Sequence, residues 1–159
     1  MEIFRNKSDG DKEVFLQSAQ EYLSGCNVEE IYYFGGYLGA YMESVNECIW
    51  IDMACKVING YVSDDTGLYF ALWLMSQGEK VLLEALTNPD SLANLPYIPF
   101  GNAEFEMLMS VTFEMIGEDM DIEKVHSIQI KCLEIIAPDI QYKNNDKYGN
   151  YECFEDGME

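Results

Sequence analysis

Basic side chains are scarce in this sequence relative to acidic ones. The 159 residues include nine Lys and Arg against 29 Asp and Glu, a formal net charge of −20 at neutral pH. A surface this negative repels nucleic acid and anionic membranes, and it speeds encounters with basic partners. We therefore expect neither direct nucleic-acid binding nor membrane binding, and we expect a basic protein partner.

Long hydrophobic runs are missing as well. No stretch reaches the roughly 18 consecutive apolar residues of a transmembrane helix. The first residues also lack the basic-then-apolar order of a secretory signal, so we expect a cytoplasmic protein. The five cysteines are odd in number and include no close Cys-x-x-Cys pair, which predicts free thiols rather than disulfides or a zinc site.

Catalytic signatures are absent too. The sole histidine, His126, has no second His and no Cys at a ligand spacing. The chain contains no glycine-rich phosphate loop after a strand, no Gly-x-Ser-x-Gly elbow and no His-Glu-x-x-His motif. We therefore expect no catalytic residue, no metal and no cofactor, and we favour a binding protein over an enzyme.

What the sequence does contain is apolar residues at helical spacing along most of its length. The 3-4-3-4 rhythm predicts about seven helices, and no segment alternates strongly enough to demand a strand. We predict an all-α, single-domain bundle over residues 1–138. Residues 139–159 lose this periodicity and are rich in Tyr, Asn and acidic residues, which predicts a loosely ordered tail.

Polar residues mark where several of these helices should begin. Asn27 with Glu30 three residues later predicts a capping box. Ser63, Asn102 and Asp121 stand where the N-caps of later helices belong.

Three glycines, Gly35, Gly36 and Gly39, fall within one helical segment. Each weakens an isolated helix by about 1 kcal/mol relative to alanine. We expect them to admit a neighbouring backbone, with the approach of a ligand as the alternative.

The sharpest polar turn is Ser63-Asp64-Asp65, at the centre of residues 49–92. Adjacent carboxylates in a first helical turn interact favourably with the helix dipole by about 0.3–1 kcal/mol each, so capping alone can explain them. A metal or catalytic site would need further donors such as Asp90, and contact with a partner is the third possibility. Trp50 and Trp73, on either side of this turn, are expected to pack into the core.

Residues 49–93 resemble a bacterial domain family of unknown function. The family pattern is a Leu-Trp, a Ser-Asp-Asp turn, a Phe-Arg-x-Trp-Leu segment, a Gly and Asp-Pro-Asp-Ser-Leu-Ala. The family cysteine before the turn is Val62 here, and the family arginine is Ala71. The resemblance implies an all-helical domain and supplies no activity. The residues that carry it include Trp50, Ser63, Asp64, Asp65, Phe70, Trp73, Gly78, Pro89 and Asp90.

The acidic residues are spread unevenly. Seven acids and no base lie between Lys12 and Lys56, and nine acids and no base lie between Lys80 and Lys124. A negative patch with aromatic anchors suits a basic partner, whereas the simpler explanation is solubility alone. The expected partner-contacting residues are Glu29, Glu30, Tyr33, Tyr37, Glu43, Glu47, Asp64, Asp65, Tyr97, Glu104 and Glu106.

The leading functional hypothesis is an immunity protein that covers the basic active surface of a cognate toxin. One alternative is a nucleic-acid mimic that inhibits a DNA- or RNA-handling complex, which regular carboxylate spacing along one face would favour. Another is a small metal-dependent hydrolase that uses Asp64, Asp65 and Asp90, whose carboxylates would then converge on one pocket. A regulatory or scaffolding domain without a dedicated partner is the fourth possibility.

Overall fold

The computed structural model describes residues 1–141, and it contains eight α-helices and four short 3-10 helices within them, with no strand. The all-α prediction is confirmed. The predicted tail lies outside the described residues from position 142 onward. The α-helices are α1 (Glu2–Ser8), α2 (Lys12–Ser24), α3 (Val28–Asn46), α4 (Ile49–Asn59), α5 (Asp64–Ser76), α6 (Glu79–Thr87), α7 (Val111–Ile116) and α8 (Ile122–Ile136). The 3-10 helices are η1 (Pro89–Asn94), η2 (Glu106–Met109), η3 (Gly117–Asp119) and η4 (Ala137–Asp139).

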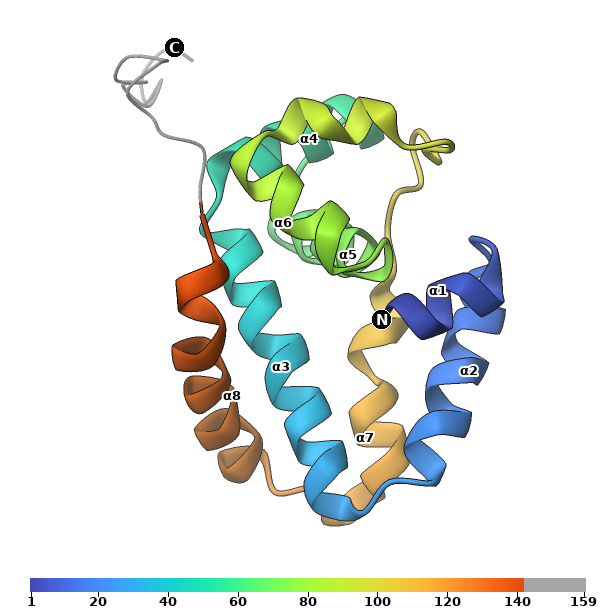
Figure 1. Ribbon diagram of the computed structural model, residues 1–159, viewed down its shortest axis with the longest axis vertical. Helices are drawn as coiled ribbons and strands as arrows, with labels where there is room; N and C mark the ends of the chain where they lie inside the picture. Colours follow the sequence, from blue (N-terminus) through green and yellow to red (C-terminus); the bar gives the residue numbers. More distant parts are fainter. Residues whose placement is uncertain (142–159) are drawn as a thin grey trace, which may run out of the picture.

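The helices form two groups along the long axis of the molecule (Figure 1). In the lower group α2 and α7 run downward, and α3 and α8 run upward side by side. The upper group consists of α4, α5 and α6, with α1 at its edge. None of the helices in residues 1–141 combines the length and the apolarity that crossing a bilayer would require.

Local capping explains several helix starts. The Asn27 side chain accepts a hydrogen bond from the Glu30 amide at 3.0 Å, and the Glu30 carboxylate accepts one from the Asn27 amide at 2.8 Å, so the predicted capping box is confirmed. Asp121 caps α8 by accepting from the Lys124 amide at 3.0 Å. These bonds satisfy amides that the first helical turn leaves without a partner.

The prediction that Asn102 begins a helix is wrong, because α7 starts only at Val111 after the turn of η2. The amide of Ala103 donates to the Asn59 side chain at 2.9 Å, and the amide of Phe105 donates to the Tyr69 carbonyl at 2.9 Å. Because these bonds tie the segment to α4 and α5, its backbone follows an irregular path. The sequence prediction also missed α1, whose short length and mostly polar residues hide its pattern.

The glycines of α3 face neighbouring helices. A Cβ on Gly36 would lie 2.6 Å from the Ile128 side chain and 3.2 Å from the Gln129 amide nitrogen, and one on Gly35 would lie 2.8 Å from Thr112. The expected close approach of a neighbouring backbone is therefore confirmed, and it brings α8 directly onto α3.

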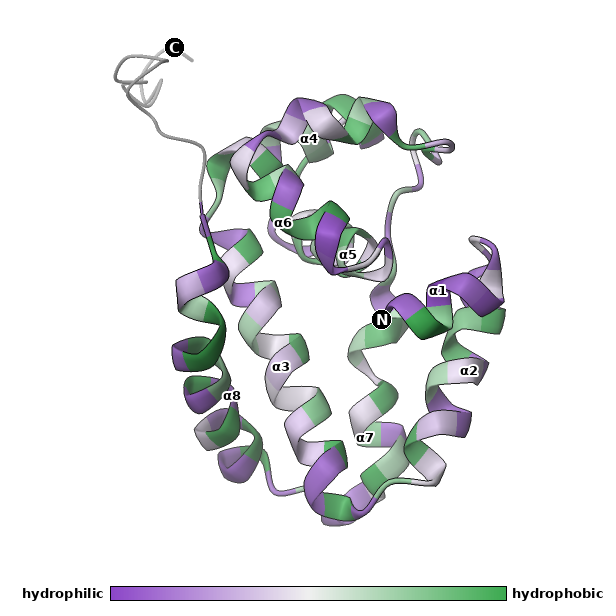
Figure 2. Cartoon of the chain, in the orientation of Figure 1, coloured by the Kyte–Doolittle hydropathy of each residue, from purple (hydrophilic) through white to green (hydrophobic). Residues whose placement is uncertain are grey.

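Two hydrophobic clusters hold the helices together, and hydrophobic and hydrophilic residues alternate along the helices that form them (Figure 2). The larger one surrounds α5, in which Phe70, Leu72 and Leu74 are fully buried. The smaller one joins α3 and α8 through Tyr32, Ala40, Ile128, Cys132 and Ile136. Ile140 packs against both clusters, so the helical body continues past residue 138.

Candidate interaction surface

The Ser63-Asp64-Asp65 turn is the start of α5, with Ser63 as its N-cap as predicted. The Ser63 hydroxyl accepts from the Thr66 amide at 3.3 Å, and the Thr66 hydroxyl accepts from the Ser63 amide at 2.7 Å. Asp64 and Asp65 occupy the first turn and are exposed. Their carboxylates therefore lie near the positive end of the helix dipole while still facing solvent.

Five carboxylates gather around this helix start: Asp52, Asp64, Asp65, Glu104 and Glu106, here called the acidic corner. Asp52 and Asp64 line one hollow of about 410 Å³ together with Asn46, Val62, Ser63 and Gly67. Partial burial raises the pKa of the Asp52 carboxyl.

Tyr69 links the other members of the acidic corner. Its hydroxyl donates to the Glu106 carboxylate at 3.1 Å, and this hydrogen bond is the main cause that raises the pKa of Tyr69. The negative charges of Asp65 and Glu104 raise it further. Asp65 lies one turn before Tyr69 on α5, and Glu104 and Glu106 flank Phe105, whose amide donates to the Tyr69 carbonyl. No local signal in the sequence ties Tyr69 to Glu106, which lies 37 residues later.

The remaining predicted contact residues lie elsewhere, and several have partners within the chain. Glu29 forms an ion pair with Lys124 at 2.6 Å, and Glu43 accepts a hydrogen bond from Gln129 at 2.9 Å. The Glu30 carboxylate belongs to the capping box. Tyr33 and Tyr37 are half-buried against the α3–α8 cluster. Glu47 is the exposed C-cap residue after α3, and Tyr97 is 74% exposed in the loop after η1.

The residues of the family-like pattern have mainly structural positions. Phe70 and Trp73 are buried, with ring centroids 5.2 Å apart. Gly78 precedes α6 with a φ of 100°, a conformation that favours glycine. Pro89 is buried at the start of η1, while Asp90 is exposed beside it. Trp50 is only half-buried, and it faces an apolar groove rather than the acidic corner.

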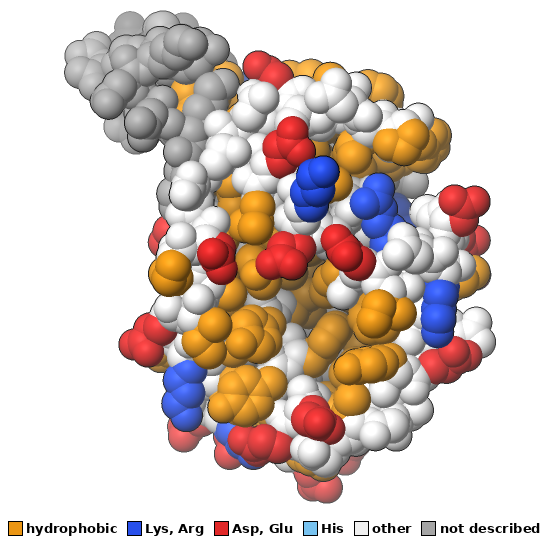
Figure 3. Space-filling model, viewed as in Figure 1, with side chains coloured by type: hydrophobic (Ala, Val, Ile, Leu, Met, Phe, Trp, Pro, Cys, Tyr) orange, Lys and Arg blue, Asp and Glu red, His pale blue; other side chains and the backbone are white. Residues whose placement is uncertain are grey.

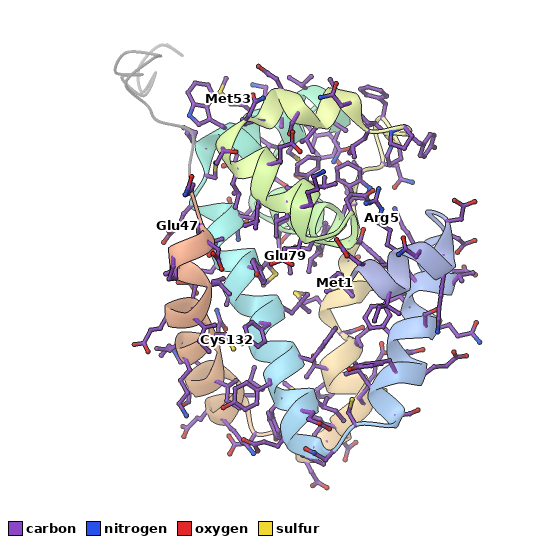
Figure 4. The ribbon with its side chains drawn as sticks, viewed as in Figure 1. Met1, Arg5, Glu47, Met53, Glu79 and Cys132 are labelled. Carbon is purple, nitrogen blue, oxygen red and sulfur yellow. The ribbon has the colours of Figure 1, made fainter. Side chains whose placement is uncertain are left out.

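This groove, here called the α4 groove, has a volume of about 380 Å³ and lies between α4, η1 and the following loop. Asp90 is its one charged lining residue. Figure 4 places the groove residue Met53 at the outer edge of the upper helices, above Glu47. The residues that line it are Trp50, Met53, Ala54, Val57, Ile58, Pro89, Asp90, Leu92, Ala93, Ile98 and Phe100.

The sequence prediction missed the α4 groove although its signal was visible. The 11-residue helix α4 has more apolar residues than one buried face needs. They are residues 49, 50, 51, 53, 54, 57 and 58. In the structure Ile51 and Ile58 are buried, whereas Met53 is 44% and Val57 is 78% exposed. The surplus apolar residues form the outer face of α4.

Metal ligands do not gather in the described part of the chain. No group of three or more His, Cys, Asp or Glu side chains in residues 1–141 is placed to hold a metal ion. Asp64 lines the hollow at the acidic corner and Asp90 lines the α4 groove, so these two carboxylates face different cavities. Burial raises the pKa of the Cys55 thiol to about 11, which keeps it protonated at neutral pH.

The negative charge of the surface is largely uncompensated. Between side chains of the described residues there is one ion pair, Lys124 with Glu29. Figure 3 shows acidic side chains spread over the visible face, with few Lys and Arg between them. None of the five carboxylates of the acidic corner forms an ion pair with a described side chain, although the charge of Glu104 opposes the effect of burial, which lowers the pKa of Lys12.

Comparison with known protein families gave a match for this chain. A family model described as "Protein of unknown function (DUF4240)" matches residues 1–118, which include both the acidic corner and the α4 groove. Neither the curated proteins nor the solved structures gave a match.

Proposed function

The chain belongs to the DUF4240 family of proteins of unknown function, and we propose that it is an acidic binding protein rather than an enzyme. Its partner in this proposal is a basic protein, most concretely a toxin domain whose active surface it covers as an immunity protein in the cytoplasm. Opposite charges raise association rates by roughly 10- to 1,000-fold over those of uncharged surfaces.

One observation carries this proposal: the carboxylates greatly outnumber their internal partners. The sequence has 29 acids and nine bases, and one ion pair joins side chains of the described residues. Charges left unpaired within a protein destabilise it through mutual repulsion. A basic partner would relieve that repulsion on binding.

The arrangement of the acidic corner favours a toxin partner over nucleic-acid mimicry. Asp65, Glu104 and Glu106 form a compact group around Tyr69, whereas a mimic of a nucleic-acid backbone needs carboxylates at regular intervals along a face. An aromatic side chain within a charged patch also supplies the desolvated contact that slows dissociation.

The test is binding to the product of the gene adjacent to this one, measured over a salt series. A variant with Asp64→Asn, Asp65→Asn, Glu104→Gln and Glu106→Gln should associate on the order of ten-fold more slowly. The matched control removes four exposed acids far from the corner, through Glu118→Gln, Asp119→Asn, Glu123→Gln and Glu134→Gln.

Both variants lose four negative charges. A difference between their association rates therefore reports direct contact at the acidic corner rather than net charge. Circular dichroism checks that each variant is folded, since removal of Asp64 and Asp65 weakens the start of α5 by up to about 1 kcal/mol each. Failure to retain any basic partner at low salt would contradict the proposal.

A further inference from the structure

We infer that the α4 groove is the site where a basic amphipathic segment of the partner anchors its apolar side chains. The inference deepens the proposed function and rests on it, because it assigns a second contact surface to the same basic partner. It follows from the shape of the groove, from its position beside the acidic corner and from its one charged residue.

The exposed apolar surface extends along α4 beyond the lining of the groove itself, because Ile49 continues it. Ile49, Met53 and Val57 follow one another at four-residue spacing on α4 and are 57%, 44% and 78% exposed. Eight residues of helix span about 12 Å. Phe100 extends the surface from the facing loop and is 70% exposed. Neighbouring exposed apolar side chains of this kind are typical of a protein-binding site.

The helix α4 stands between the apolar and the acidic surfaces. Its Asp52 lines the hollow at the acidic corner, whereas its Met53 and Val57 line the groove. A segment lying across α4 would therefore place apolar side chains in the groove and basic ones over the corner. Such a helix-in-groove contact uses two or three apolar anchors on one helical face.

Asp90 indicates the charge that the occupant should carry beside its apolar anchors. Its side chain is exposed within the lining of the groove, and no described residue forms a hydrogen bond or an ion pair with it. A Lys or Arg next to an anchor would pair with this carboxylate.

A second copy of this chain fits the groove poorly. Each copy carries a formal net charge of −20, so the two would repel one another. The same negative charge that opposes a dimer attracts a basic occupant.

The test uses an 18-residue helical peptide of Leu and Lys without Trp, a scrambled version of equal charge, and a Leu and Glu version. Trp50 reports binding by fluorescence, since it lines the groove while Trp73 is buried. In 150 mM NaCl we expect the amphipathic Leu and Lys peptide to bind at least ten-fold more tightly than either comparison peptide.

Two variants of the full chain locate the contact. Met53→Asn with Val57→Asn removes exposed apolar groups from the groove and should weaken peptide binding at least ten-fold. The matched control, Ile122→Asn with Ile135→Asn, removes apolar groups that are 73% and 56% exposed on α8 and should change affinity less than two-fold. Asp90→Asn should weaken binding and reduce its salt dependence.

Equal affinity of the groove variant and the wild type would overturn the inference, as would equal binding of the scrambled peptide. Dimers that the groove substitutions convert to monomers would identify a second copy as the occupant and overturn it too. One more outcome would also overturn the inference. If a variant with Tyr148→Ser, Tyr151→Ser and Phe154→Ser binds the peptide ten-fold more tightly and shows a shifted Trp50 emission, the C-terminal segment is the occupant.

Failure of the inference is distinguishable from failure of the proposed function. If the adjacent gene product binds the groove variant and the wild type equally but binds the corner variant slowly, the groove assignment fails and the proposed function stands. If that product is not retained at low salt, the proposed function fails whatever the peptide does.

Discussion

Gly36 and Gly67 both lie within helices, yet their surroundings differ. A side chain at Gly36 would meet the α8 backbone at 3.2 Å, whereas one at Gly67 would meet only the side chains of Asp52 and Val62, at 3.5 and 3.8 Å. At the first distance the α8 backbone must shift by a few tenths of an ångström, whereas the distances at Gly67 are ordinary van der Waals contacts. Substitution at Gly36 therefore tests the close packing of α3 on α8, whereas substitution at Gly67 tests the intrinsic cost of glycine in a helix.

We predict opposite effects of alanine at these two positions. Gly36→Ala should lower the free energy of unfolding by about 1–3 kcal/mol, because it overpacks the contact between α3 and α8. Gly67→Ala should raise it by up to about 1 kcal/mol, because alanine favours the helix. Urea denaturation followed by circular dichroism measures both. Equal effects at the two positions would contradict the close approach of α8.

Tyr69 and Glu106 illustrate how single residues form the acidic corner. The hydrogen bond between them joins the middle of α5 to the first residue of η2. The adjacent backbone bond from Phe105 to Tyr69 holds Glu104 and Glu106 beside Tyr69, one helical turn after Asp65. Tyr69, which the sequence did not single out as a contact residue, thus joins predicted contact residues into the proposed interaction surface.

At the scale of elements, α5 depends on how it begins. It is the most buried helix, and its first turn is held by reciprocal bonds between Ser63 and Thr66. We predict that Ser63→Ala lowers the free energy of unfolding by about 0.5–2 kcal/mol, because the Thr66 amide loses its acceptor.

Ser63→Asn is the matched control, since asparagine caps helices about as well as serine. It should retain most of the wild-type stability in the same urea titration. A loss as large as that of the alanine variant would show that Ser63 acts through something other than its capping hydrogen bond.

Two other helices, α4 and α8, have distinct roles in the fold. The outer face of α4 is apolar and faces the groove, and its inner face packs into the larger cluster. The helix α8 lies beyond residues 1–118 that the family model matches, yet it packs on α3 at the glycines. It buries Cys132 and Ile128 against α3, so it completes the bundle rather than standing apart (Figure 4).

At the scale of the whole molecule, unpaired negative charge opposes folding. Raising NaCl from about 10 mM to about 150 mM shortens the Debye length from about 30 Å to about 8 Å, which screens repulsion between distant carboxylates. We predict that Tm rises by roughly 2–4 °C over this interval, equivalent to about 1 kcal/mol. Differential scanning calorimetry measures the change.

The variant that neutralises Glu118, Asp119, Glu123 and Glu134 serves as the control. With four fewer negative charges, it should show a smaller rise in Tm over the same salt interval. A flat or falling Tm in the wild type would indicate that self-repulsion contributes little to stability.

Much of this protein could be predicted from sequence because the relevant interactions are local. The caps at Asn27, Ser63 and Asp121 depend on residues three positions away, and the helical rhythm depends on neighbours within two turns. The acidity of the surface follows from composition alone. The family resemblance also rested on residues close together in the chain.

Tertiary structure decided the features that depend on contacts between distant segments. Asn59 holds Ala103, which prevents a helix from starting at Asn102. Periodicity identified the apolar residues of α4, but only packing determined which of them remain exposed beside η1. The acidic corner likewise exists because α5 and the segment before η2 meet, 37 residues apart, and a sequence pattern carries no information about that meeting.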